Sequence, residues 1–134
     1  MSRFEQIRGG YVTVAVDGTD YRIYYEEAGE GVPLICLHTA GADSRQWRHV
    51  LNDPDITSRF HVVAFDLPYH GRSNPPKGWR RQPYAPSAGG SPRVTRAVSA
   101  ASGFDQPVLL VLPNLTNRRT AQIAEARQQY TDKM

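Results

Sequence analysis

Cysteine and long apolar runs are scarce in this sequence, and each shortage excludes a class of protein. The single cysteine, Cys36, excludes an internal disulfide and any zinc site built from several cysteines. No stretch approaches the ~20 consecutive apolar residues that a membrane span requires, and residues 1–10 contain no apolar signal segment. We therefore expect a cytoplasmic chain that is neither secreted nor inserted in a membrane.

The placement of the four histidines does not suit a metal centre. His49 and His61 have no partner at metal-ligand spacing, and neither H-E-x-x-H nor C-x-x-C occurs. The sequence therefore predicts no metal site and no cofactor. Because Cys36 lies within the apolar run of residues 34–37, we expect a buried apolar side chain there rather than a reactive thiol.

Carboxylates are absent from a long central stretch, and this absence divides the chain. Residues 1–66 carry six basic and ten acidic residues, whereas residues 67–134 carry ten basic and three acidic ones. The net charge changes from −4 to +7 between these halves, and no carboxylate side chain lies between Asp66 and Asp105.

With 134 residues, of which 40% are hydrophobic, the chain has the length and composition of one globular domain at most.

The first half has the pattern of an α/β fold. Residues 11–16 and 21–26 are rich in β-branched and aromatic side chains and flank an Asp-Gly turn signal, which predicts an antiparallel hairpin. Residues 33–37 and 60–65 are short apolar runs, typical of strands that are buried on both faces of a parallel sheet. We therefore expect a mixed, mostly parallel sheet that begins with an antiparallel hairpin.

A short helix is predicted between the two apolar runs. Asp43 or Ser44 is suited to be its N-cap, and Pro54 ends it. Its apolar face has helical spacing and consists of Trp47, Val50 and Leu51. A strand, a helix and a strand joined by short loops form a βαβ unit, which is right-handed in nearly all proteins.

The second half does not continue this pattern. Residues 80–103 are rich in Arg, Pro, Ser, Ala and Gly and contain hardly any large apolar residue. Such a segment buries too little surface to offset the entropy of ordering it, so we predict a disordered or irregular linker. The domain organisation expected from this pattern is an N-terminal portion of residues 1–79, the linker, and a final unit of residues 104–134.

The final unit is predicted to contain a strand and a short helix. Residues 108–112 form an apolar run typical of a buried strand. Thr120 is suited to cap a helix, and one face of that helix holds Ile123, Ala126 and Tyr130.

Polar loop segments follow both apolar runs of the first half. His38-Thr39-Ala40-Gly41 follows the first run, and residues 66–73, DLPYHGRS, follow the second. The two segments resemble the loops of the α/β-hydrolase family, in which an H-G-x-x loop follows the third strand and D-x-x-x-H-G-x-S follows the fourth. The helix that contains Trp47 and residues 74–79 are also similar to that family. The resemblance covers about residues 10–79 and implies the N-terminal part of an α/β-hydrolase fold.

The resemblance assigns an oxyanion-hole loop to His38, Thr39, Ala40 and Gly41. In α/β-hydrolases this loop donates a backbone N–H to the tetrahedral intermediate, and loss of one such donor typically costs ~2.7–4 kcal/mol of barrier. By position the donor is Ala40, with His38 packed beneath the loop. Thr39 replaces the usual glycine of the family, and a β-branched residue is poorly suited to a positive φ. If residues 66–73 did not also match the family, we would interpret His38 simply as a turn histidine with no role in a site.

The resemblance gives the second segment a mainly structural role. The Asp66 carboxylate is expected to accept backbone N–H bonds from the turn, Gly71 to let the chain reverse, and Ser73 to form a local hydrogen bond. His70 is expected at the mouth of the pocket. These four residues form the predicted structural turn.

The catalytic residues of a serine hydrolase are not found in this sequence. That chemistry needs a nucleophile in a G-x-S-x-G elbow, then an acid, then a late histidine. Residues 89–93 begin as the elbow does but end in arginine, and no apolar strand precedes them. Residues 108–112 are followed by Pro113 and Asn114 with no nucleophile, and His70 is the last histidine. We therefore predict no catalytic residue in this chain.

Three functions are compatible with these patterns. The first is a hydrolase-family protein that acts on an ester or a related acyl or carbon bond in a small-molecule substrate, truncated or frame-shifted after residue 79 and inactive as this chain. The second is a non-catalytic binding module or pseudoenzyme. The third is a basic nucleic-acid-binding protein, which the scattered placement of its basic residues disfavours. A sheet with an uncovered part is also expected to self-associate.

Overall fold

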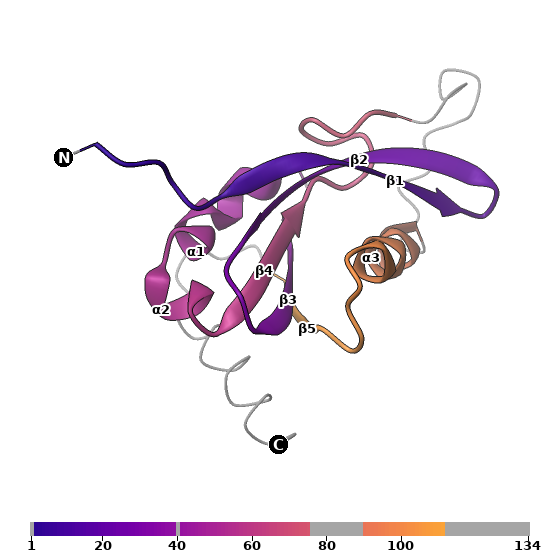
Figure 1. Cartoon of the computed structure of the whole chain (residues 1–134). Coiled ribbons are helices and arrows are strands. Elements are labelled where there is room, and N and C mark those ends of the chain that lie inside the picture. Colours follow the sequence, from indigo (N-terminus) through magenta and orange to yellow (C-terminus); the bar gives the residue numbers. More distant parts are fainter. Residues whose placement is uncertain (1, 40, 76–89, 112–134) are drawn as a thin grey trace.

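The computed structural model describes residues 2–39, 41–75 and 90–111 (Figure 1). Five strands form one sheet in the order β1-β2-β4-β3-β5. Their bounds are β1 Arg8–Val16, β2 Thr19–Ala28, β3 Val32–Leu37, β4 Phe60–Phe65 and β5 Val108–Val111. Strand β2 is antiparallel to β1 and β4, whereas β3 is parallel to β4 and β5. The predicted mixed sheet that begins with a hairpin is confirmed, and parallel pairs make up half of its pairings.

The hairpin forms at the Asp-Gly signal. Val16 pairs with Thr19, which leaves Asp17 and Gly18 as the two turn residues. Both have positive φ, 51° and 76°. Two such residues are typical of a type I′ turn, whose twist matches that of the flanking strands.

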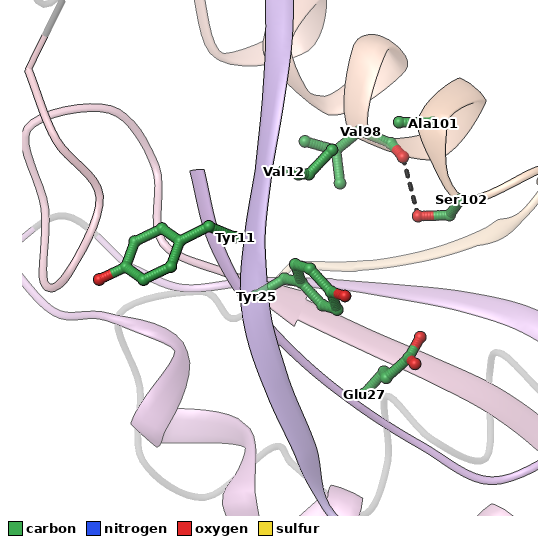
Figure 2. A pocket seen from close by; sticks show the side chains of 7 residues that line it. All are labelled: Tyr11, Val12, Tyr25, Glu27, Val98, Ala101 and Ser102. Atoms are coloured by element: carbon green, nitrogen blue, oxygen red, sulfur yellow. Dashed lines mark hydrogen bonds between the residues drawn. The ribbon is translucent and has the colours of Figure 1, made fainter. Parts of the chain in front are cut away.

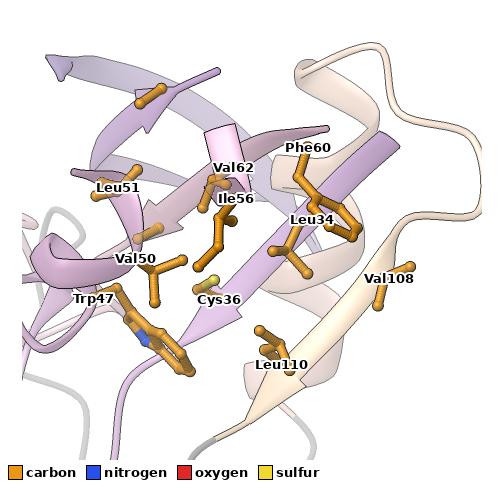
Figure 3. Close-up of a cluster of buried hydrophobic side chains, with 12 residues drawn as sticks. Leu34, Cys36, Trp47, Val50, Leu51, Ile56, Phe60, Val62, Val108 and Leu110 are labelled. Atoms are coloured by element: carbon orange, nitrogen blue, oxygen red, sulfur yellow. The ribbon is translucent and has the colours of Figure 1, made fainter. Parts of the chain in front are cut away.

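The central strands are buried on both faces, as predicted. In β3 the side chains of Leu34 and Cys36 join one apolar cluster, and Ile35 between them joins the other. The first cluster contains Trp47 and the other apolar residues of the helices that follow β3 (Figure 3). The second lies on the α3 side of the sheet. Successive side chains of a strand point to opposite faces of the sheet. A strand that is apolar at successive positions, such as β3, therefore contributes to both clusters.

Short helices cover one face of the sheet after β3. A 3-10 helix, η1 (Ser44–Trp47), continues into α1 (Arg48–Leu51), and α2 (Pro54–Thr57) follows. The Asp43 side chain caps η1 by accepting the N–H of Arg45, and the predicted apolar face is buried. The first helix ends at Leu51, ahead of Pro54, and Pro54 begins α2, because proline is well suited to the first helical position.

The prediction of an irregular linker is wrong for residues 90–101, which form helix α3 (Gly90–Ala101) on the other face of the sheet (Figure 1). Two buried valines, Val94 and Val98, lie one helical turn apart and pack in the cluster that contains Val14 and Ile23. The helix is therefore stabilised by an apolar surface that the hairpin already provides, and few large side chains of its own are needed.

Local sequence signals at the ends of α3 also favour the helix. Pro92 lies in the first turn, where proline is tolerated. Beyond the other end, Gly103 has φ +73°, its N–H donates to the carbonyl of Ala100, and the N–H of Phe104 donates to that of Ser99. These two bonds form a Schellman motif, which satisfies carbonyls at the helix end.

Strand β5 confirms the predicted strand over residues 108–111, but not its full burial, and residue 112 lies outside the described residues. Val108 and Leu110 are buried in the first cluster, whereas Leu109 and Val111 are each 49% exposed. This strand lies at the edge of the sheet, and α3 packs against β1 rather than over β5. The helix predicted from Thr120 lies outside the described residues.

Within the described part of the chain, no helix is long and apolar enough to cross a membrane.

Candidate functional site

The candidate site lies where β3 and β4 end side by side. Leu37 and Phe65, the last residues of these parallel strands, are paired. The segments that begin with His38 and Asp66 therefore leave the sheet at the same edge. In open α/β sheets ligands bind outside the carboxyl ends of the strands, which makes this edge the place to look for a site.

His38 joins the two segments. Its side chain is buried, and Nε2 accepts a hydrogen bond from the N–H of Leu67 at 2.9 Å. Because Nε2 accepts, the ring proton is on Nδ1, which donates to the carbonyl of Thr39 at 2.8 Å. Burial lowers the pKa of His38 and so favours the neutral ring that this arrangement requires.

The side chain of Gln46, in the helix that follows, forms hydrogen bonds with Thr39. The Thr39 N–H donates to Oε1 of Gln46 at 2.8 Å, and Nε2 of Gln46 donates to the Thr39 hydroxyl at 2.9 Å. The Thr39 N–H is therefore already used. The threonine does not adopt a positive φ, since Asp17, Tyr69 and Gln106 are the only described non-glycine residues that do, and Gly41 takes that conformation at +76°. Ala40, the predicted donor, lies outside the described residues.

Asp66 organises the turn after β4. The residue is 2% exposed, and its two carboxylate oxygens accept the backbone N–H groups of Ser44 and Arg72, each at 2.7 Å. Gly71 has φ +50°, and a Cβ there would lie 2.2 Å from Oδ2 of Asp66. The turn therefore closes around a carboxylate bound by main-chain donors, and it leaves no room for a side chain at position 71.

Ser73 links the turn to the neighbouring strand. Its hydroxyl donates to the carbonyl of Asp66 at 2.6 Å and accepts the N–H of Tyr24 at 3.0 Å. The residue is buried, and both of these bonds go to the main chain. Ser73 therefore acts as a structural link between β4 and β2.

His70 lies beside His38. The centroids of the two rings are 5.0 Å apart, and Nδ1 of His70 donates to the carbonyl of Pro68 at 2.9 Å. The preceding residue, Tyr69, has φ +68°, an uncommon conformation for a bulky side chain. The structure thus brings His38, Thr39, Asp66 and His70 together at one edge.

Sequence reasoning missed Gln46 and the donor of the bond to His38. Gln46 lies seven residues from Thr39 and Leu67 lies 29 residues from His38, so no local pattern links either pair. The only available signal for Gln46 was a polar residue beside Trp47 in a helix expected to be amphipathic.

Two hollows in the described part of the chain differ in their relation to these loops. One, of about 240 Å³, lies between the hairpin and α3 (Figure 2), and none of the described residues of the two loop segments lines it. Its lining residues are Tyr11, Val12, Tyr25, Glu27, Val98, Ala101 and Ser102. The other, of about 230 Å³, lies against the Asp66 turn. Within residues 2–39, 41–75 and 90–111, no three His, Cys, Asp or Glu side chains converge as a metal site would require.

Comparison with known proteins shows which family the chain belongs to. The sequence model of the alpha/beta hydrolase fold family matches residues 32–112. The soluble epoxide hydrolase of Corynebacterium sp. (strain C12) is 39% identical over 56 residues, which cover 42% of this chain and 19% of that protein. The 2-hydroxy-6-oxononadienedioate/2-hydroxy-6-oxononatrienedioate hydrolase of Burkholderia vietnamiensis is 30% identical over 73 residues, 52% of this chain and 25% of that protein.

A solved structure extends the similarity to the fold. The thermophilic esterase from Thermogutta terrifontis superposes with a TM-score of 0.65 at 20% identity, over 77% of this chain and 36% of that one. The chain spans 25% or less of the length of the two curated relatives named above. The family match covers more than half of the 134 residues. The chain belongs to the α/β-hydrolase fold family.

Proposed function

We propose that this chain forms the oxyanion-binding side of a hydrolase site for a small molecule with an ester or a related acyl or carbon bond. The observation that carries the proposal is the hydrogen bond from Leu67 to His38, which fixes the loop after β3 against the turn after β4. A backbone N–H held in place before the reaction stabilises developing negative charge without reorganisation. The N–H of Ala40 is the proposed donor.

The same proposal holds that this chain alone does not turn over substrate. A hydroxyl nucleophile needs a histidine that accepts its proton, and the sequence has no G-x-S-x-G motif and no histidine after His70. Two nearby candidates are unsuitable. The hydroxyl of Ser73 is bonded to the main chain, and burial raises the pKa of the Cys36 thiol, which keeps it protonated.

An ester-hydrolysis assay tests the absence of turnover. The chain is incubated with p-nitrophenyl acetate, with and without a serine-directed fluorophosphonate. We expect a rate equal to that of a heat-denatured sample, unchanged by the fluorophosphonate. Turnover that the fluorophosphonate abolishes would contradict this part of the proposal.

A binding experiment tests the proposed donor. A methyl phosphonate monoester resembles the tetrahedral anion and is titrated into ¹⁵N-labelled chain. Ala40→Pro removes the N–H, whereas Ala40→Gly keeps it and serves as the control. We expect Ala40→Pro to weaken binding by about 100-fold, in line with the loss of one oxyanion donor, and Ala40→Gly to bind as the unmodified chain does. Equal binding by the two variants would overturn the assignment.

A further inference from the structure

A second group of polar side chains surrounds the hollow of about 230 Å³ that lies against the Asp66 turn. It is called here the arginine hollow, and three elements contribute to it: strand β2, the η1–α1 segment and the turn after β4. Its lining residues are Tyr24, Glu26, Asp43, Arg45, Arg48, Asp66, Gly71 and Arg72. Three guanidinium groups and three carboxylates therefore meet there, and their formal charges cancel.

Two of the carboxylates are bound by arginines. Glu26 is 3% exposed and accepts Nη2 of Arg48 at 2.9 Å and the hydroxyl of Tyr24 at 3.1 Å. Asp43 accepts Nε and Nη2 of Arg45 at 2.9 and 2.8 Å, and hydrogen bonds from that arginine lower the pKa of Asp43 to about 2. These acceptors are occupied, so the hollow offers little to a cation.

The third carboxylate is satisfied in a different way. Asp66 accepts two backbone N–H groups, from Ser44 and Arg72, and has almost no exposed surface. No guanidinium forms an ion pair with it among the described residues. One of the three arginines is therefore left without a carboxylate partner.

That arginine is Arg72. Its Nη1 donates to the hydroxyl of Tyr24 at 3.0 Å, and its Cζ lies 4.9 Å from the centroid of the same ring. It forms no ion pair within residues 2–39, 41–75 and 90–111. An arginine carries five N–H donors in a planar fork that matches two oxygens of a carboxylate or phosphate. The remaining N–H donors of Arg72 therefore lie beside carboxylates that already have partners. An anion with several oxygens would complement these donors.

We propose that the arginine hollow binds a small oxyanion, the carboxylate or phosphate group of a metabolite, with Arg72 as its principal contact. Arg45 and Arg48 bind their carboxylates through Nε and Nη2, so Nη1 of each is the donor that they contribute to the oxyanion. Because the three guanidinium groups are partly in solvent and the net formal charge is zero, binding is modest and falls with ionic strength. This site is separate from the proposed oxyanion loop and does not depend on any hydrolytic activity.

The test uses inorganic phosphate, acetate and chloride at matched ionic strength, with binding followed by ¹⁵N-NMR of the arginine side chains. We expect phosphate or acetate, and not chloride, to shift the Arg72 Nε resonance in a saturable way. Saturation by phosphate alone or by acetate alone identifies which oxyanion the hollow prefers. No saturable shift with either anion, or an equal response to chloride, would overturn the proposal.

Charge-matched variants separate the hollow from a general effect of basic residues. Arg72→Gln is expected to weaken binding at least about tenfold, since it removes the unpaired guanidinium, while Arg96→Gln on α3 removes the same charge elsewhere and leaves binding unchanged. Arg72→Lys keeps the charge but loses the fork and is expected to bind at an intermediate level; it also serves if Arg72→Gln does not fold. Equal weakening by Arg72→Gln and Arg96→Gln would contradict the site. Ala40→Pro is expected to leave phosphate binding intact, which distinguishes the two anion sites.

Discussion

The two segments at the carboxyl edge of the sheet are held in different ways. The turn after β4 surrounds a buried carboxylate, Asp66, with backbone donors and has no space for a side chain at Gly71. The loop after β3 is held through side chains, by the Gln46 amide on Thr39 and by His38. The turn is therefore the rigid support, and the loop is positioned against it. A main-chain donor can be placed accurately on a loop when the segment beneath it is fixed.

The largest expected effect comes from comparing glycines in the two segments. Both glycines have a positive φ, which strains an alanine at either position. The Cβ of Gly71→Ala would also clash with the Asp66 carboxylate, whereas the Cβ of Gly41→Ala would have no described atom within 4 Å. We expect Gly71→Ala to lower the free energy of unfolding by about 3 kcal/mol and Gly41→Ala by about 1 kcal/mol, measured by urea denaturation. Equal losses would show that the turn is no more tightly packed than the loop.

Removal of the link between the segments is expected to have the next largest effect. His38→Ala leaves the partly buried N–H of Leu67 without its acceptor, which is expected to cost about 2 kcal/mol of stability. His38→Gln retains an acceptor at a similar reach and is expected to recover part of the loss. If both variants were as stable as the unmodified chain in the same denaturation experiment, the link would not hold the two segments together.

Acid should weaken the same link. Burial lowers the pKa of His38 below its usual 6.5, so the unfolded chain binds the proton more readily than the folded one. The contribution of this residue is therefore complete above pH 6.5 and declines as the pH falls from 6.5 to the folded pKa. We expect the His38→Gln variant to lose this part of the pH dependence of stability. An unchanged pH profile in that variant would exclude His38 as its source.

The smallest effect is expected at Gln46. Gln46→Ala removes the side-chain amide that bonds to Thr39 and is expected to cost about 1 kcal/mol of stability, with faster hydrogen exchange of the Thr39 amide. Gln46→Glu keeps an acceptor for the Thr39 N–H and is the matched control, with exchange between the two. Unaltered exchange in Gln46→Ala would mean that the loop is held by His38 alone.

The strands of the first half could be predicted from sequence because their burial is recorded locally. In β3 and β4 most positions belong to one of the two apolar clusters, so the apolar runs at residues 33–37 and 60–65 mark the strands almost to the residue. The hairpin turn could also be predicted from adjacent residues, because its two positions need a positive φ and the Asp17-Gly18 pair adopts that conformation readily.

The parts that could not be predicted depend on distant residues. Helix α3 has two buried valines, Val94 and Val98, and is stable because the hairpin supplies the surface against which they pack. The bonds that hold Thr39 and His38 come from Gln46 and Leu67, which only the folded chain brings near. For the candidate site, the sequence therefore marked the two segments through their resemblance to a family, and the contacts between them required the structure.

The bond between Leu67 and His38 can be observed directly by NMR. In doubly labelled protein at pH 7.5, a scalar coupling across the hydrogen bond should join the ¹⁵N of the Leu67 amide to Nε2 of His38, with the ring proton on Nδ1. A ring protonated on Nε2, with no coupling to Leu67, would show that the two segments are not joined and would remove the support for the proposed oxyanion loop.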